Sequence, residues 1–132
     1  MKLANEGDSL GRRGEILASI AWPGGIAWAN IAKTSIDGEI TYVIRARTPS
    51  LVEMDVEFHY ADREQAERDF SVVLWGIAKL SIDEPRKKLT RQGFAVYLES
   101  KSRPEMERER ALAKVFKIPE PRFGLTVERR LS

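Results

Sequence analysis

The stretch ITYVIRARTPSLVEMDVEFHY, residues 40–60, decides the fold of this chain because it alternates apolar and polar side chains along two segments. In residues 40–47 and again in residues 51–60, every second side chain is apolar. An alternation with period two is typical of a β-strand that has one buried and one solvated face. We therefore predict a β-hairpin with residues 48–50 in its loop.

The loop position also predicts how the two strands of this hairpin pair. On the solvated face Arg45 is expected to face Glu53, an opposite-charge pair. On the buried face Met54 is expected in the core, opposite Ile44. Both faces support one register, because apolar side chains meet apolar ones and charges meet opposite charges. The inward pairs are predicted to be Ala46–Val52, Ile44–Met54, Tyr42–Val56 and Ile40–Phe58.

The segments before the hairpin predict two further strands. Residues 15–22 and 26–33 alternate on either side of a Pro-Gly-Gly turn, and residues 35–38 contain a turn signal, Asp-Gly. A helix over residues 9–22 is the open alternative for the first of them. Residues 1–14 carry glycines and polar side chains with little to bury, and we expect a flexible N-terminal arm.

Two helices are predicted after the hairpin. Asp62 is expected to cap a helix that runs to about Leu80. A capping box of Ser102 and Glu105 is expected to begin a second helix, which ends near Phe116. The wet side of the first helix is assigned four charged residues: Glu64, Glu67, Arg68 and Asp69.

Two strands complete the prediction. Residues 93–101 place Phe94, Val96 and Leu98 on one face, and residues 122–128 form a last short strand. The fold class is therefore α+β, with a mainly antiparallel sheet in the order ββββ-α-β-α-β and two helices packed on one face. Residues 15–132 are expected to form a single domain.

Length and composition restrict the class of protein. A chain of 132 residues fits one domain, and the absence of cysteine excludes disulfides and thiolate metal sites. The longest uncharged stretch, residues 16–32, is short and is broken at Pro23, so we predict neither a signal peptide nor a membrane-spanning segment. The expected location is the cytoplasm, without a membrane partner.

Charge is distributed unevenly along the chain. Residues 1–83 carry nine Lys/Arg and 13 Asp/Glu, a net charge of −4, whereas residues 84–132 carry 13 Lys/Arg and seven Asp/Glu, a net charge of +6. A basic half is a recognised hint of a polyanionic partner, although the two halves can equally attract each other. The nucleic-acid-binding candidates are Arg86, Lys87, Lys88, Arg91, Arg129 and Arg130.

No set of residues with a complete catalytic pattern occurs in the sequence. His59 lies on the same strand face as Glu57, but no nucleophile is indicated beside it. A glycine-rich phosphate loop and a cluster of metal ligands are also missing from the sequence. We therefore expect no cofactor and no metal, and a non-enzymatic protein is favoured.

One constellation resembles a known enzyme family. Glu99-Ser100-Lys101 ends a predicted strand, and Asp83 lies upstream of it. This pattern resembles the PD-(D/E)xK nucleases. The resemblance implies that Asp83 and Glu99 would bind Mg²⁺ while Lys101 assists the attacking water.

The leading hypothesis is a binding or assembly protein of the kind found in phages and other mobile elements. It would act through its surface and through edge strands that pair with a protein partner or with a second copy. Trp22 and Trp28, which flank the Pro-Gly-Gly turn, are the candidates for protein contact. The alternatives are a nucleic-acid-binding protein that uses the basic half and a Mg²⁺-dependent nuclease.

Overall fold

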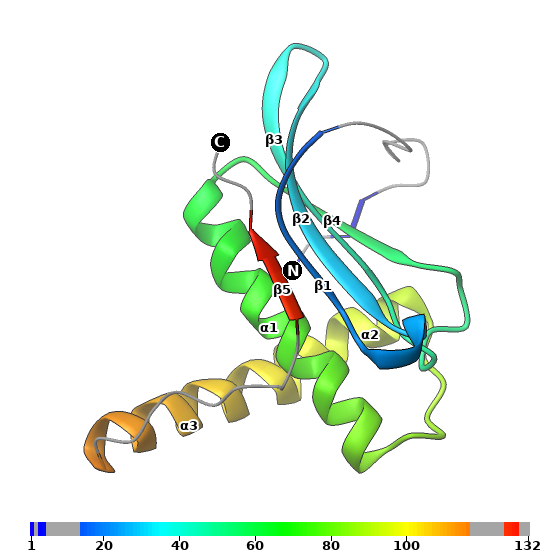
Figure 1. The fold of residues 1–132 in the computed structure, drawn as a ribbon, viewed down its shortest axis with the longest axis vertical. Helices are drawn as coiled ribbons and strands as arrows, with labels where there is room; N and C mark the ends of the chain where they lie inside the picture. Colours follow the sequence, from blue (N-terminus) through cyan, green and yellow to red (C-terminus); the bar gives the residue numbers. More distant parts are fainter. Residues whose placement is uncertain (2, 5–13, 117–125, 130–132) are drawn as a thin grey trace.

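A five-stranded antiparallel sheet forms the centre of the protein (Figure 1). The computed structural model describes residues 1, 3–4, 14–116 and 126–129. The strands lie in the order β4-β3-β2-β1-β5, and each is antiparallel to its neighbours. Their bounds are β1 (Glu15–Ala21), β2 (Trp28–Ile36), β3 (Glu39–Arg47), β4 (Val56–Tyr60) and β5 (Thr126–Arg129).

Helices follow the first four strands. Helix α1 (Arg63–Asp83) packs against β2, β3 and β4, and α2 (Arg91–Tyr97) continues through a π-helical turn into α3 (Arg103–Phe116). The protein is therefore α+β with an antiparallel sheet, as the sequence predicts. Strands were also expected over residues 15–33, and the alternative helix is wrong for the residues that form β1.

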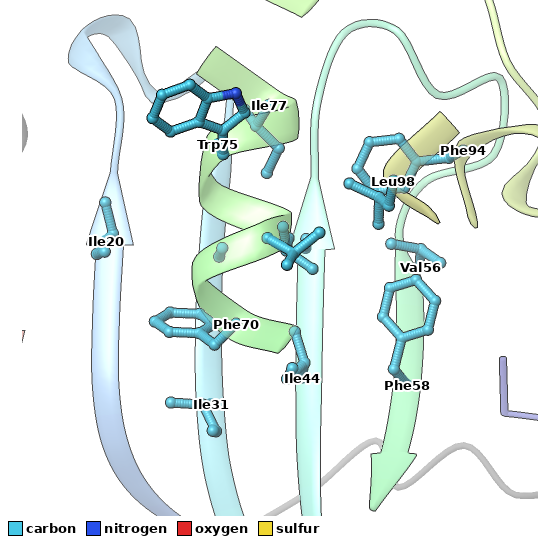
Figure 2. Close-up of a cluster of buried hydrophobic side chains, with 14 of the residues drawn as sticks. Ile20, Ile31, Ile44, Val56, Phe58, Phe70, Trp75, Ile77, Phe94 and Leu98 are labelled. Carbon is cyan, nitrogen blue, oxygen red and sulfur yellow. The ribbon is translucent and has the colours of Figure 1, made fainter. Parts of the chain in front are cut away.

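A single hydrophobic cluster lies between the sheet and α1 (Figure 2). Alternate residues of the strands point toward the helix because successive side chains of a strand point to opposite faces. Phe94 and Leu98 join the cluster beside Val56. The sheet and α1 contribute Ile20, Ile31, Ile44, Val56, Phe58, Phe70, Trp75 and Ile77.

The predicted register of the β3–β4 hairpin is wrong. Ile44 pairs with Phe58 and Arg45 with Glu57, so each partner lies four residues later than expected. A shift by an even number of residues keeps every side chain on its predicted face, so alternation does not distinguish the two registers. The pairs predicted for Val52 and Met54 are not formed, because residues 48–55 make a loop rather than a strand.

Leu51 explains why the strand begins late. Its side chain is buried, and its backbone forms a parallel bridge with Leu89. The residues after it are therefore carried away from β3, and the Met54 side chain is 71% exposed. The prediction of a core position for Met54 is wrong.

The strand predicted over residues 93–101 is also wrong, because this segment is helical. The Thr90 hydroxyl accepts a hydrogen bond from the Gly93 N–H at 3.0 Å and caps α2. Phe94, Leu98 and Ser102 are buried at the four-residue spacing of a helix, whereas Val96 is 54% exposed. The element order is ββββ-α-α-α-β, and Ser102 is not the cap of a separate helix.

The helices cross closely at Gly76 of α1. A Cβ atom at this position would overlap the Leu98 side chain, which is fully buried. Beside it the buried Ser102 hydroxyl donates to the Val72 carbonyl oxygen at 2.9 Å. Glycine is therefore needed at residue 76 for its lack of a side chain.

The termini are described in part. Of the predicted arm, Met1 and Leu3 pack against the core, and the Ala4 N–H donates to the Glu57 carbonyl at 2.9 Å. Residues 2 and 5–13 lie outside the described residues, as does the first part of the predicted last strand, whose described part is β5. No described helix is long and apolar enough to cross a bilayer.

The corrected register can be tested with two substitutions. Phe58→Ala should lower the free energy of unfolding by about 3–5 kcal/mol, because this side chain is fully buried. Met54→Asp should change it by less than about 0.5 kcal/mol, because the side chain is exposed. Urea denaturation followed by circular dichroism measures both. Equal destabilisation by the two variants would contradict the register.

The helix crossing makes a separate prediction. Gly76→Ala should destabilise the protein by about 1–3 kcal/mol through overpacking against Leu98, although alanine favours helix by about 1 kcal/mol. Leu98→Ala should cost less in the Gly76→Ala background than in the wild type, because the methyl group then has room. A double-mutant cycle by denaturation measures this coupling. Additive effects would show that the two positions do not touch.

Candidate functional site

The β2–β3 hairpin projects beyond its neighbours (Figure 1). The two strands form nine residue pairs, which end at Ile36 and Glu39. Pairing between β1 and β2 stops at Lys33, and pairing between β3 and β4 begins at Tyr42. Residues 34–41 are named here the hairpin tip. Among the described residues, residues 35–41 of this tip have no sheet partner beyond the hairpin itself.

The turn fixes which backbone groups face outward. Asp37 and Gly38 both have positive φ, 51° and 82°, as in the two-residue type I′ turn that Asp-Gly favours. The residues that flank such a turn, Ile36 and Glu39, bond to each other, and the backbone groups then alternate between the two edges. The N–H and C=O of Ile40 consequently point away from β2, toward the β4 side, where the described residues supply no ladder partner.

A groove of about 360 Å³ lies beside this edge. Its volume falls within the range of roughly 300–1,000 Å³ that is usual for binding pockets. The groove lies between the hairpin tip, the end of β4 and the N-terminal residues that pair with β4. Its lining includes apolar Leu3, Ile36 and Ile40 and polar Asp37, Glu39 and His59.

The groove is acidic. Asp37 and Glu39 are exposed, and neither forms an ion pair with another described residue. The described lining contains no Lys or Arg. Ile40 follows Glu39 in β3 and is 57% exposed. The arrangement combines a backbone edge that has no ladder partner among the described residues, an exposed apolar side chain and two carboxylates.

His59 is held at the margin of this groove. Its Nε2 lies 2.7 Å from a carboxylate oxygen of Glu57, whose other oxygen lies 3.4 Å from Nε of Arg45. Thr41 offers a hydroxyl in the same groove, but this hydroxyl donates to the Glu39 carbonyl oxygen. Among the described residues His59 therefore has an orienting carboxylate and no nucleophile hydrogen-bonded to it.

A second polar cluster is buried between β4 and the helices. Asp69 is 1% exposed and accepts hydrogen bonds from Tyr60 Oη at 2.8 Å, Gln65 Nε2 at 3.0 Å and Arg103 Nη2 at 2.6 Å. Burial, then the hydrogen bond to Asp69, raises the pKa of Tyr60 well above its ordinary value. Three donors satisfy this carboxylate, so the cluster joins β4, α1 and α3 rather than offering a free group.

The prediction that Asp69 lies on the wet side of α1 is wrong. Its spacing contained the signal, because Asp69 follows Ala66 by three residues and precedes Val73 by four, which places all three on one helix face. Arg103 also donates to Glu99 at 3.0 Å, and the Met1 amino group lies 2.9 Å from the same carboxylate.

The structure places the predicted nucleic-acid-binding residues in different surroundings. Lys88 Nζ donates to the Pro49 carbonyl oxygen at 2.8 Å, and Arg91 Nε donates to the Asp55 carbonyl oxygen at 2.7 Å. Both side chains therefore hold the 48–55 loop. Lys87 lies 3.3 Å from the Glu84 carboxylate, and Arg86 is exposed. The side chain of Arg129 and all of Arg130 lie outside the described residues.

The residues of the nuclease resemblance do not form a common site among the described residues. Glu99 and Lys101 lie in the π-helical turn, not at the end of a strand. Glu99 is engaged by Arg103, whereas Asp83 lies 3.6 Å from Nζ of Lys79. No group of three or more metal-ligating side chains occurs in the part of the chain that the structure describes.

The two candidate tryptophans have different surroundings. Both are half-buried, on either side of the short 3₁₀ turn Pro23–Gly25. Trp22 packs against the hydrophobic core. Trp28 pairs with Ala21 and Arg47, on the sheet face that Asn30 and Arg45 share. Trp22 is thus a core residue in part, whereas Trp28 lies on the face of the sheet that Asn30 and Arg45 share.

Comparison with known proteins adds no family to this geometry. No family model matches the chain. No curated protein and no solved structure matches it either.

The ion pair between Glu99 and Arg103 predicts a pH dependence. Hydrogen bonds from Arg103, and from the terminal amine, lower the pKa of Glu99 to about 2 against an ordinary 4.5. A lowered pKa contributes stability above the unfolded value, and this contribution is lost as pH falls from about 4.5 toward 2. Glu99→Gln should therefore cost up to about 1 kcal/mol at pH 7, since the side chain is 42% exposed.

The difference in the free energy of unfolding between the wild type and Glu99→Gln should become smaller as the pH falls from about 4.5 toward 2. Denaturation at a series of pH values measures it. Glu107→Gln is the matched control, because Glu107 is exposed on α3 and forms no ion pair with another described residue. A difference that stays constant down to pH 2 would contradict the assignment.

Proposed function

We propose that this protein is a non-enzymatic binding or assembly protein that docks an extended segment of a protein partner along β3 at the hairpin tip. One observation carries the proposal: the N–H and C=O of Ile40 face a groove and have no ladder partner among the described residues. An extended segment laid in this groove would continue the sheet on the side where β4 ends.

Strand addition uses the groups that the tip leaves free. Main-chain hydrogen bonds supply affinity, and side-chain contacts on the two faces supply specificity. Natural proteins usually protect a free strand edge with proline, lysine or a covering segment. The tip, TSIDGEIT over residues 34–41, contains neither proline nor lysine. An edge that lacks these residues, and that no described segment covers, supports docking of a partner.

The two alternative functions have less support. For a nucleic-acid-binding surface, Lys88 and Arg91 are less suitable than the sequence indicates, because both side chains already donate hydrogen bonds within the protein. A nuclease needs carboxylates that share a metal, and Glu99 is engaged by Arg103 instead. Neither alternative has an observation of its own comparable to the free edge of β3.

A peptide-display selection tests the proposal without knowledge of the partner. A library of random short peptides would be selected on the wild-type protein and counter-selected on Ile40→Pro. Proline lacks an N–H and is tolerated where that N–H faces away from the paired strand, so Ile40→Pro should fold and lose the edge donor. Ile40→Val is the matched control, because it keeps both the N–H and a β-branched side chain.

We expect peptides that bind the wild type and Ile40→Val and lose at least tenfold in affinity for Ile40→Pro. Circular dichroism should show the same fold for all three proteins. Selected peptides that bind Ile40→Pro as tightly as the wild type would place the binding surface elsewhere. A selection that enriches no peptide dependent on Ile40 would overturn strand addition.

A further inference from the structure

We infer that the partner segment alternates apolar and cationic side chains, with a Lys or Arg beside Glu39 and an apolar residue beside Ile40. This inference rests on the proposed function and names the chemistry of the occupant. It follows from three features of the groove: the face on which each tip residue lies, the charge of the lining, and the spacing of a strand.

The faces of the hairpin tip are fixed by alternation from the core. Ile44 is buried against α1, so Ile40, two pairs earlier in β3, lies on the same side of the sheet. Glu39 and Thr41 lie on the opposite side, which is also the side of Arg45 and Glu57. A strand added to β3 would share this pleat, so its successive residues would face Glu39, Ile40 and Thr41 in turn.

Burial favours an apolar residue opposite Ile40. This side chain is 57% exposed, although its position on the α1 face continues the apolar row of Ile44. An apolar side chain on the neighbouring strand would cover part of the exposed surface, and directly opposed side chains of a sheet pack against each other.

Charge favours a cation opposite Glu39. The carboxylates of Asp37 and Glu39 lack an ion-pair partner among the described residues. The described lining of the groove offers no Lys or Arg that would neutralise them. His59 is already held by Glu57 at 2.7 Å. A Lys or Arg of the partner would supply the missing charge, whereas an acidic segment would be repelled.

The same charges argue against a second copy of this chain at the edge. If two hairpin tips paired antiparallel through Ile40, the Glu39 side chains of the two copies would be diagonal neighbours on one face, roughly 7–8 Å apart. In a parallel pairing they would face each other directly. Either arrangement brings like charges together without a cation between them. The occupant is therefore a segment of a different protein, in which every second residue is basic.

Defined peptides test this inference. The probes are three short, labelled synthetic peptides in which Val alternates with Lys, with Glu or with Ser, and fluorescence anisotropy measures their binding to the full chain. The variant is Glu39→Lys. The matched control is Glu107→Lys, which changes the net charge equally at an exposed residue of α3 that does not line the groove.

The Lys/Val peptide should bind the wild type most tightly. Glu39→Lys should weaken this binding about tenfold, which corresponds to about 1.4 kcal/mol, and should shift the preference toward the Glu/Val peptide. Glu107→Lys should leave the three peptides in the same order of affinity. Ile40→Pro should weaken all three peptides, because the edge donor is required whatever the side chains.

Two results would overturn the inference and leave strand addition intact. In one, the three peptides bind equally and depend on Ile40. In the other, Glu39→Lys and Glu107→Lys weaken the Lys/Val peptide by the same factor, which would show attraction by net charge alone. If the Lys/Val peptide does not bind while the display selection yields Ile40-dependent peptides, the inference fails and the proposed function stands. Failure of that selection itself counts against the proposed function.

Discussion

The hydrogen-bonded ladder between β2 and β3 is the constraint on which the rest of the structure depends. Its nine pairs run from Trp28 and Arg47 to the Asp37–Gly38 turn. The first half of the ladder carries core residues such as Ile44, to which α1 packs. The last three pairs extend past the described parts of both neighbouring strands and form the hairpin tip. One continuous ladder therefore fixes both the core and the position of the edge that has no partner among the described residues.

The sequence predicts the strands of this ladder better than their pairing. Alternation identifies a strand and its buried face, and the faces of Ile44 and Phe58 are as predicted. Alternation repeats every two residues, however, so it allows any even shift of register. The register is determined by contacts between distant parts of the chain: the bridge from Leu51 to Leu89 and the hydrogen bond from the Arg91 N–H to Glu53. No local pattern contains these contacts.

A similar ambiguity explains the strand that was predicted in place of a helix. Phe94, Val96 and Leu98 alternate, but Phe94, Leu98 and Ser102 also follow a helical spacing, and short apolar segments satisfy both patterns. The close crossing at Gly76 decides between them, because Leu98 and Ser102 must face α1 together. Of the candidate site, the sequence contains the Asp-Gly turn and predicts a role for edge strands. It does not reveal which edge is free, since that depends on where β4 stops.

Net charge summed over halves of a sequence is a poor guide to this surface, because electrostatic action depends on where the charges lie. Lys88 in the basic loop donates a hydrogen bond to the carbonyl oxygen of Pro49, which follows the end of β3. Glu39 lies at the other end of that strand, as its first residue. The nine residues of this strand are separated by steps of about 3.3 Å, so its two ends lie roughly 26 Å apart. Screening at physiological salt acts over about 8 Å. A partner of the kind proposed for the hairpin tip would therefore meet the carboxylates beside the groove, at a distance from the loop that contains Lys88.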